Sequence, residues 1–196
     1  MASNFTVVYD ACVLYPFYLR DVLMHLAMSD ICRAKWTDLI QDEWIRSVLK
    51  NRPELTVEKF TKTKELMNSH VRDCLVTEFE WLIPTLTLPD PDDRHVLAAA
   101  IVCNANQIIT FNIKDFPQDV LDKHDIEALH PDDFIANLVD LNPIKAFNAI
   151  EKARRFLKKS PKNFDEYLDI LLNQELPISV SLLRQLQSEI WIIYTS

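Results

Sequence analysis

The sequence contains no glycine in its 196 residues, although average usage would give about fourteen. Three common kinds of site need glycine-rich loops: the Walker A phosphate loop, the GxGxxG dinucleotide fingerprint and the GxSxG nucleophile elbow. The absence of glycine excludes all three. Left-handed turns must then be made by asparagine and aspartate, the next most tolerant residues, and we expect such turns at Asn104 and Asn106.

The sequence also lacks the clusters of cysteine and histidine that bind zinc. Its four cysteines include no CxxC pair, and its five histidines are scattered along the chain. Each cysteine has apolar neighbours, so we interpret all four as reduced thiols of the core. They are Cys12, Cys32, Cys74 and Cys103.

No apolar run approaches the roughly 20 residues of a membrane-spanning helix, and the N-terminus lacks the basic-then-apolar order of a signal peptide. We therefore expect a cytoplasmic protein without membrane contact. The net charge of −8 disfavours a protein that coats nucleic acid, because phosphates attract basic surfaces. It does not exclude a nuclease whose carboxylates hold the cations that neutralise the phosphate.

Short apolar segments alternate with helical patterns over the first part of the chain. This alternation predicts an α/β fold with a mostly parallel sheet, formed by residues 1–141. Three helical segments without strands follow, and they predict a helical subdomain at residues 142–196. The expected strands are residues 5–9, 31–36, 82–89 and 107–111, and the expected helices are about residues 11–30, 38–49, 56–71, 93–104, 131–141, 144–159, 163–173 and 179–190.

Acidic and amide side chains lie where such a sheet places its sites. Asp10 and Asn112 each follow a predicted strand, and open α/β sheets bind ligands at the carboxyl ends of their strands. Asp93 begins a helix that can open onto the same edge, and Glu43 lies beside the apolar face of its own helix. Converging carboxylates repel one another unless a cation neutralises them, and oxygen ligands suit Mg²⁺ or Mn²⁺. The pattern favours a metal-dependent phosphoryl hydrolase.

Helix capping is the structural alternative for the aspartates of the PDPDD segment. Asp92 is the predicted N-cap of the following helix, and we interpret Asp90 and Asp92 as turn and cap groups rather than ligands. We interpret His95 as facing solvent or contacting substrate. Capping does not explain Asp10, since burying a carboxylate at the end of an apolar strand is costly without a cation.

Taken in order, these segments resemble the PIN-domain ribonucleases, in particular the VapC-like toxins of type II toxin–antitoxin systems. The resemblance covers about residues 5–139. It implies a PIN-like three-layer α/β/α fold with a helical C-terminal extension, and a ribonuclease that hydrolyses RNA with Mg²⁺ or Mn²⁺ held by Asp10, Glu43, Asp93 and Asp115. The motifs are VVYDACVLYP with Asp10, DEW with Glu43, DPDDRHVLAAA with Asp93, and TFNIKDFP with Asn112 and Asp115.

Asn112 departs from the family, in which an acid is common at this position. An amide can still coordinate a hard cation through its carbonyl oxygen, so Asn112 stays a candidate metal ligand beside Asp115. By analogy with the family, we expect Thr110 to hydrogen-bond an acidic ligand, and Asp92 is a candidate for a similar supporting role. The resemblance also implies a structured RNA substrate such as tRNA, and a cognate antitoxin that places a basic side chain in the acidic cleft. A homodimer is a further expectation.

Two functions of other classes stay open at this point. A PIN-like fold kept as a binding module would act through its helical tail, whose first helix is basic. A haloacid-dehalogenase-type phosphatase would use Asp10 as its nucleophile. That reading is weakened by the absence of a DxDxT motif, because residue 12 is cysteine.

Overall fold

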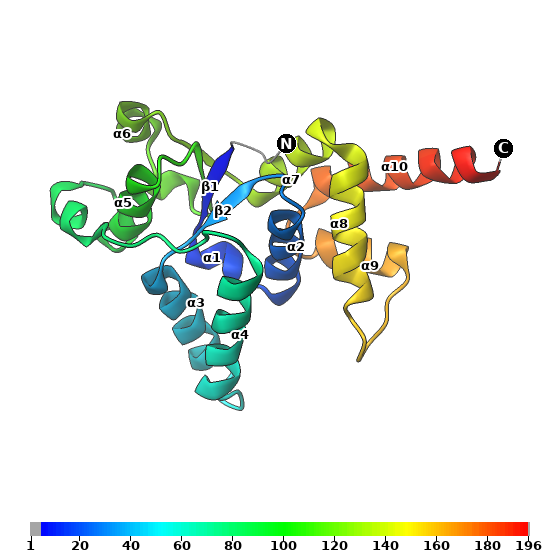
Figure 1. Cartoon of the computed structure of the whole chain (residues 1–196), viewed down its shortest axis with the longest axis horizontal. Helices are drawn as coiled ribbons and strands as arrows, with labels where there is room; N and C mark the ends of the chain where they lie inside the picture. Colours follow the sequence, from blue (N-terminus) through cyan, green and yellow to red (C-terminus); the bar gives the residue numbers. More distant parts are fainter. Residues whose placement is uncertain (1–4, 196) are drawn as a thin grey trace.

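The centre of the molecule is a parallel sheet of four strands in the order β2-β1-β3-β4 (Figure 1). The computed structural model describes residues 5–195, with side chains to residue 189. The strands are β1 (Thr6–Tyr9), β2 (Arg33–Lys35), β3 (Gln107–Ile109) and β4 (Glu127–Leu129). All three pairings are parallel, and Val8 of β1 faces Lys35 on one side and Ile108 on the other. The predicted α/β class with a parallel central sheet is therefore confirmed.

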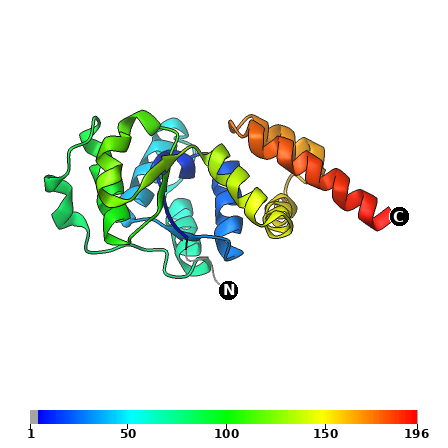
Figure 2. The ribbon, with the colours of Figure 1, turned by 90° about the horizontal axis from the view of Figure 1, so that it is seen from above.

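Helices cover both faces of this sheet, which explains why its central strand is wholly apolar. Val7, Val8 and Tyr9 of β1 are completely buried. In Figures 1 and 2, α5 (Arg94–Val102) lies on one side of the strands, whereas α2 (Phe17–Met28) and α7 (Pro131–Leu141) lie on the other. Tyr9 packs edge-on against Phe134 of α7. The layers are those of the expected three-layer α/β/α arrangement.

The predicted helix at residues 11–30 is two helices in the structure. A short helix α1 (Ala11–Leu14) ends before Pro16, and α2 begins at Phe17. Pro16 has no backbone N–H to donate and adopts an extended conformation, so a continuous helix is broken there. The next two helices, α3 (Asp38–Asn51) and α4 (Val57–His70), lie close to their predicted positions. Thr37 caps α3 by accepting a 3.1 Å hydrogen bond from the Ile40 N–H.

The strand predicted at residues 82–89 is wrong. Residues Glu80–Thr85 form a 3₁₀ helix, η1, that packs on α5. Val76 and Phe79 are buried against Ala98 and Ala99 in a small second apolar cluster, which Leu82, Ile83 and Leu86 also join. These apolar residues are three and four positions apart, so they lie on one face of a helical turn. In a short apolar run, the sequence alone does not distinguish such a turn from a strand.

Several short elements connect α5 to the C-terminal helices. Asp90 precedes η2 (Pro91–Asp93), which leads directly into α5. After β3 the chain forms η3 (Ile113–Asp115), α6 (Gln118–Leu121) and η4 (Asp122–His124) before it enters β4. These connections place residues 110–116 beside the carboxyl end of β1, since β1 and β3 are neighbours.

The predicted C-terminal helices are present as α8 (Pro143–Arg155), α9 (Phe164–Leu172) and α10 (Pro177–Thr195). α8 packs on α2, and α10 packs on α7 before it extends away from the other helices (Figure 2). The domain boundary predicted between residues 141 and 142 stays a prediction. Across the described part of the chain, none of the helices has the length and apolar character required to cross a membrane.

Six residues of the described chain adopt a left-handed backbone conformation, and all are non-glycine: Asp30, Asp73, Glu78, Asn104, Asp125 and Glu175. The prediction for Asn104 is confirmed, with φ of 50°. The prediction for Asn106 is wrong. Its side-chain oxygen instead accepts a 2.9 Å hydrogen bond from the Thr6 N–H, which ties the turn before β3 to the start of β1.

We expect the substitution Glu78→Gly to stabilise the protein by about 0.5 kcal/mol. The left-handed conformation costs an ordinary residue about 1–2 kcal/mol, whereas glycine loses about 0.5–1 kcal/mol through its larger unfolded-state entropy. The Glu78 side chain is exposed, so little packing is lost. Urea denaturation measures the change, with Glu80→Gly in η1 as the matched control, which we expect to be destabilising. Equal destabilisation by both substitutions would contradict the strain argument.

Candidate metal centre

Asp10 lies at the carboxyl end of β1 and is almost completely buried, with 2% of its surface exposed. The backbone N–H of Ala11 donates to Asp10 Oδ1 at 2.6 Å. Thr110 Oγ1 donates to Asp10 Oδ2 at 2.7 Å, and Cys12 Sγ donates to the same oxygen at 3.0 Å. The carboxylate is therefore held in one orientation by the Thr110 hydroxyl, the backbone N–H at the start of α1 and the Cys12 thiol.

Thr110 links the two strand ends that form the site. Its hydroxyl donates to Asp10 and accepts a 2.9 Å hydrogen bond from the Asn112 backbone N–H. The hydrogen bond expected from Thr110 to an acid is thus present. Cys12 adds a second link, because its sulfur accepts a 3.3 Å hydrogen bond from the Phe111 N–H. Burial raises the pKa of the Cys12 thiol, and Asp10 raises it further, so the thiol keeps its proton and can donate it.

Asp93 lies at the N-terminus of α5, but its side chain does not cap that helix. The predicted N-cap role of Asp92 is also wrong. Asp90 is the residue that caps the turn, by accepting a 2.9 Å hydrogen bond from the Asp92 N–H. Asp90 is therefore a capping group, in agreement with its prediction as a turn or cap residue. The half-buried carboxylate of Asp93 caps no helix.

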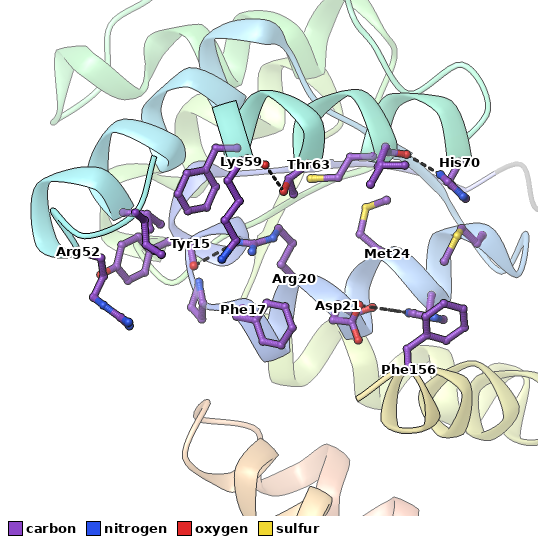
Figure 3. A pocket seen from close by; sticks show the side chains of 18 residues that line it. Tyr15, Phe17, Arg20, Asp21, Met24, Arg52, Lys59, Thr63, His70 and Phe156 are labelled. Atoms are coloured by element: carbon purple, nitrogen blue, oxygen red, sulfur yellow. Dashed lines mark hydrogen bonds and ion pairs between the residues drawn. The ribbon is translucent and has the colours of Figure 1, made fainter. Parts of the chain in front are cut away.

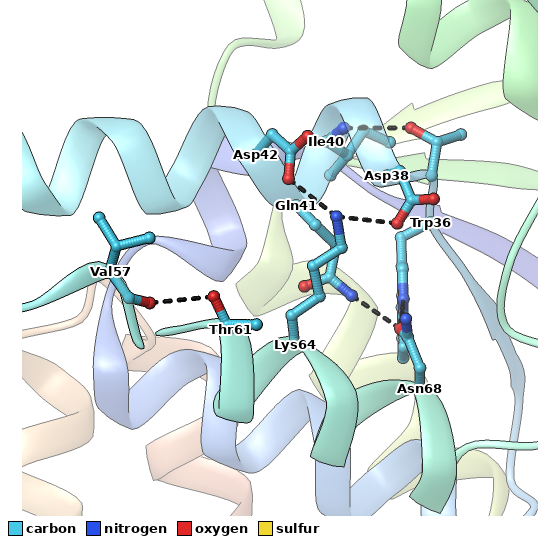
Figure 4. A network of polar contacts seen from close by, with 10 residues as sticks. Trp36, Asp38, Ile40, Gln41, Asp42, Val57, Thr61, Lys64 and Asn68 are labelled. Carbon is cyan, nitrogen blue, oxygen red and sulfur yellow. Dashed lines mark hydrogen bonds and ion pairs between the residues drawn. The ribbon is translucent and has the colours of Figure 1, made fainter. Parts of the chain in front are cut away.

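α3 brings Glu43 to the same region, and a polar network with α4 fixes the rotation of α3 (Figure 4). Asn68 Oδ1 of α4 accepts hydrogen bonds from Trp36 Nε1 at 2.9 Å and from Gln41 Nε2 at 2.8 Å. Lys64 of α4 pairs with Asp38 and Asp42 of α3 at 2.9 and 2.8 Å. Because these α3 side chains are held toward α4, the next residue, Glu43, turns toward α5.

Glu43 meets His95 of α5, whose Nε2 lies 3.1 Å from Glu43 Oε2. The imidazole side chain is only 13% exposed, whereas the Glu43 side chain is 42% exposed. The prediction that His95 faces solvent is therefore wrong. The other alternative, a contact with substrate, stays a prediction. Burial lowers the pKa of His95, and its Nδ1 is buried without a hydrogen-bond partner in the described part of the protein.

The acids of the site share one electrostatic field. Burial raises the pKa of Glu43 to about 7, and the charge of Asp10 is the next cause, opposed by Arg46. Burial likewise raises the pKa of Asp93 to about 7, followed by the charges of Asp10, Asp90, Asp115 and Glu43. Carboxyl groups whose pKa values are raised by each other's charges lie close together, and a cation between them would remove the repulsion.

The acidic side chains of the site suit a hard divalent cation, although in this conformation they do not surround a single point. Among the described residues, no three His, Cys, Asp or Glu side chains are grouped tightly enough to hold a metal ion. The carboxylates of Asp10, Glu43, Asp93 and Asp115, called the acidic cluster below, are oxygen ligands of the kind that Mg²⁺ and Mn²⁺ favour. Asp10, Glu43 and Asp93 come from three different elements, and Asp115 in η3 acts on Asp93 through its charge. Asn112 is exposed and forms no side-chain cap of η3.

The roles of two residues in this region were not predicted. His95, interpreted from the sequence as facing solvent or contacting substrate, is the second residue of α5, and its partner Glu43 is 52 residues away in the sequence. No local pattern indicates such a contact. Cys12 lies two positions after Asp10. That proximity to a predicted ligand is the one signal that could have indicated its hydrogen bond.

A separate groove lies between α2, α3 and α4, with Phe156 after α8 at its edge (Figure 3). Its volume is about 810 Å³. Phe156 is 66% exposed, and it packs edge-on against His25. Arg20 is buried beneath, where its guanidinium lies 4.3 Å from the Trp44 ring and donates to the Leu14 carbonyl. The apolar lining includes Met24, Met28, Leu55, Phe60, Leu66 and Met67, and the charged lining residues are Arg20, Asp21, Arg52 and Lys59.

Comparison with known proteins gives one family match, in the C-terminal part of the chain, and one curated relative. Residues 131–185, which run from α7 into α10, match the family described as VapC50 C-terminal domain. A protein of Mycobacterium tuberculosis named "Putative ribonuclease VapC50" is 55% identical over 49 residues, which are 25% of this chain and 29% of that protein. The matched part thus spans under a third of the length of this curated relative. Over residues 131–185, the chain therefore resembles the C-terminal domain of the VapC50 family.

Proposed function

We propose that this chain is a metal-dependent endoribonuclease and the toxin of a toxin–antitoxin pair. The single observation that carries the proposal is the acidic cluster at the carboxyl end of β1 and β3, where burial and then the charge of Asp10 raise the pKa of both Glu43 and Asp93. When they are ionised, such carboxylates repel one another unless a cation lies between them. The similarity to a protein named as a ribonuclease agrees with phosphodiester hydrolysis as the reaction.

Asp10, Glu43 and Asp93 would hold the cation, and Asp115 and the Asn112 carbonyl oxygen are further candidates. When bound, Mg²⁺ or Mn²⁺ would supply activation of water and neutralisation of the charge on the scissile phosphate. The task of this chain is to orient the carboxylates. Thr110, Cys12 and the Ala11 N–H fix Asp10 before any ligand arrives, so that little reorganisation is needed on binding.

The test of this function is Mn²⁺-dependent cleavage of RNA by the purified chain. We expect fragments whose 5′ ends, when sequenced after brief induced expression, map to a small number of positions in a structured RNA such as tRNA. The alternative, a PIN-like binding module with weakened catalysis, is favoured by the amide at position 112. Calorimetry without detectable Mn²⁺ binding at millimolar concentrations would support that alternative.

Removal of divalent cations should make the stability of the protein depend on pH. Because the folded-state pKa values of Glu43 and Asp93 lie above their unfolded values, the folded state binds protons more tightly. In EDTA, we therefore expect the unfolding temperature to fall as the pH rises from 6 to 8, and Mn²⁺ to restore it at pH 8. The charged or titratable groups that face these two carboxyls are Asp10, Arg46, Asp90, Asp92, Asp115 and His95.

A Glu43→Gln/Asp93→Asn double variant is the control for that measurement. It lacks both carboxyls with raised pKa values, so its unfolding temperature should change less between pH 6 and 8, and Mn²⁺ should have little effect. Equal pH dependence of the two proteins in EDTA would show that other groups cause the change.

The groove beside α2 and α4 offers a surface for the antitoxin. Its lining is mostly apolar, and Arg20, Arg52 and Lys59 outnumber the single acid, Asp21. This combination suits an apolar segment that carries acidic side chains. α3 contributes to both regions, since Val48 lines the groove and Glu43 belongs to the acidic cluster.

A further inference from the structure

We propose that His95 is a positioning residue that holds the Glu43 carboxylate in the orientation needed to bind the cation. The inference rests on the proposed metal site and adds a residue to it. His95 itself would contact neither the cation nor the RNA.

The contact between the two side chains joins two helices. Glu43 projects from α3 and His95 from α5, and Nε2 lies 3.1 Å from Oε2. In the part of the chain that the structure describes, this contact is the one hydrogen bond or ion pair formed by the Glu43 carboxyl group. His95 therefore determines where one oxygen of Glu43 lies and leaves the other, Oε1, for a ligand.

The surroundings of the imidazole favour a single arrangement of its proton. With the N–H at Nε2, the ring donates to the carboxylate, and Nδ1 keeps only a buried lone pair without a partner. With the proton at Nδ1, a buried N–H would be unpaired and the Nε2 lone pair would face the carboxylate oxygen. The first arrangement is the more favourable, because unsatisfied buried N–H groups are the rarer and costlier kind.

Glu43 needs such a restraint more than Asp10 does. Three hydrogen bonds fix the Asp10 carboxylate, whereas the Glu43 side chain is 42% exposed and has one more rotatable bond. A free glutamate loses its rotamer freedom when it binds a ligand, and a donor that orders it beforehand removes part of that cost. Groups that orient a metal ligand in this way typically contribute 10- to 100-fold in metal affinity.

The experiment compares Mn²⁺ binding by wild type, His95→Leu and His95→Gln, measured by calorimetry without RNA. Leucine has a similar size but no donor, whereas glutamine keeps an N–H donor at the end of its side chain. We expect a 10- to 100-fold larger Kd for His95→Leu and a Kd within about threefold of wild type for His95→Gln. At saturating Mn²⁺, the RNA cleavage rate of His95→Leu should approach that of wild type, which a catalytic residue would not allow.

A Glu43→Ala background tests whether the effect passes through Glu43. If His95 acts through the Glu43 carboxylate, adding His95→Leu to Glu43→Ala should change the Kd by less than about twofold. Wild-type affinity in His95→Leu, or a full additional loss in the double variant, would overturn the inference and leave the metal site intact. Loss of affinity in both His95→Gln and His95→Leu would indicate a direct ligand and also overturn it. Absence of Mn²⁺ binding by wild type would instead overturn the proposed function, and this inference with it.

Discussion

Asp10→Asn and Asp93→Asn should each reduce Mn²⁺-dependent RNA cleavage by about 100- to 1,000-fold, the usual effect of removing one strong electrostatic group from an active site. Both substitutions remove a negative charge from the acidic cluster and keep the size of the side chain. Asparagine at position 10 can still accept from the Ala11 N–H and remain in contact with Thr110, so the fold should persist. The measurement is the initial rate of cleavage of a structured RNA at fixed Mn²⁺ concentration.

Asp119→Asn in α6 is the matched control. It removes the same charge at an exposed position that is not part of the acidic cluster, and we expect wild-type activity. Circular dichroism and unfolding temperature should be similar for all four proteins. If both acidic-cluster variants cleaved RNA as fast as wild type, Asp10 and Asp93 would have no part in catalysis and the proposed site would be wrong.

Asp132→Ala should lower the free energy of unfolding by about 2–4 kcal/mol, because it removes hydrogen bonds from a buried charged acceptor. Asp132 is 3% exposed in the first turn of α7. Its two carboxylate oxygens accept from the backbone N–H groups of Ile178 and Ser179, each at 2.8 Å. These are free N–H groups of the first turn of α10, where an anion is also favoured by the helix dipole.

Urea denaturation of Asp132→Ala and Asp133→Ala measures this contribution. Asp133 is the next residue in the same helical turn but is exposed, so its replacement should change the free energy of unfolding by less than about 0.5 kcal/mol. Asp132→Asn keeps one acceptor oxygen and should lie between the two. Equal stability of the Asp132 and Asp133 alanine variants would mean that α10 does not depend on the carboxylate for its attachment to α7.

The parts of the fold that the sequence predicts well are those with a local cause. Val7 and Val8 form a continuous apolar strand that only a sheet covered on both faces explains, and Thr37 is an ordinary helix cap. The prediction failed where the structure of a segment depends on its contacts with another part of the chain. Leu82, Ile83 and Leu86 are apolar because α5 lies against them, and no feature of their own segment distinguishes a 3₁₀ turn from a strand.

The site divides in the same way. The positions of Asp10 and Asp93 follow from strand ends and helix starts, which are visible in the sequence. The contact between His95 and Glu43 depends on the rotation of α3, and that rotation is set by Asn68 and Lys64 of a different helix. Residues that act through a partner elsewhere in the chain therefore have to be found in the structure.

The missing glycines also bear on the charge of the protein. Five of the six left-handed positions are occupied by acids, namely Asp30, Asp73, Glu78, Asp125 and Glu175. Glycine at these five turns would change the net charge from −8 to −3. Much of the excess negative charge is thus carried by residues of left-handed turns rather than by the acidic cluster. The overall charge of this chain is consequently a poor guide to whether it binds RNA, because much of it reflects the geometry of its turns.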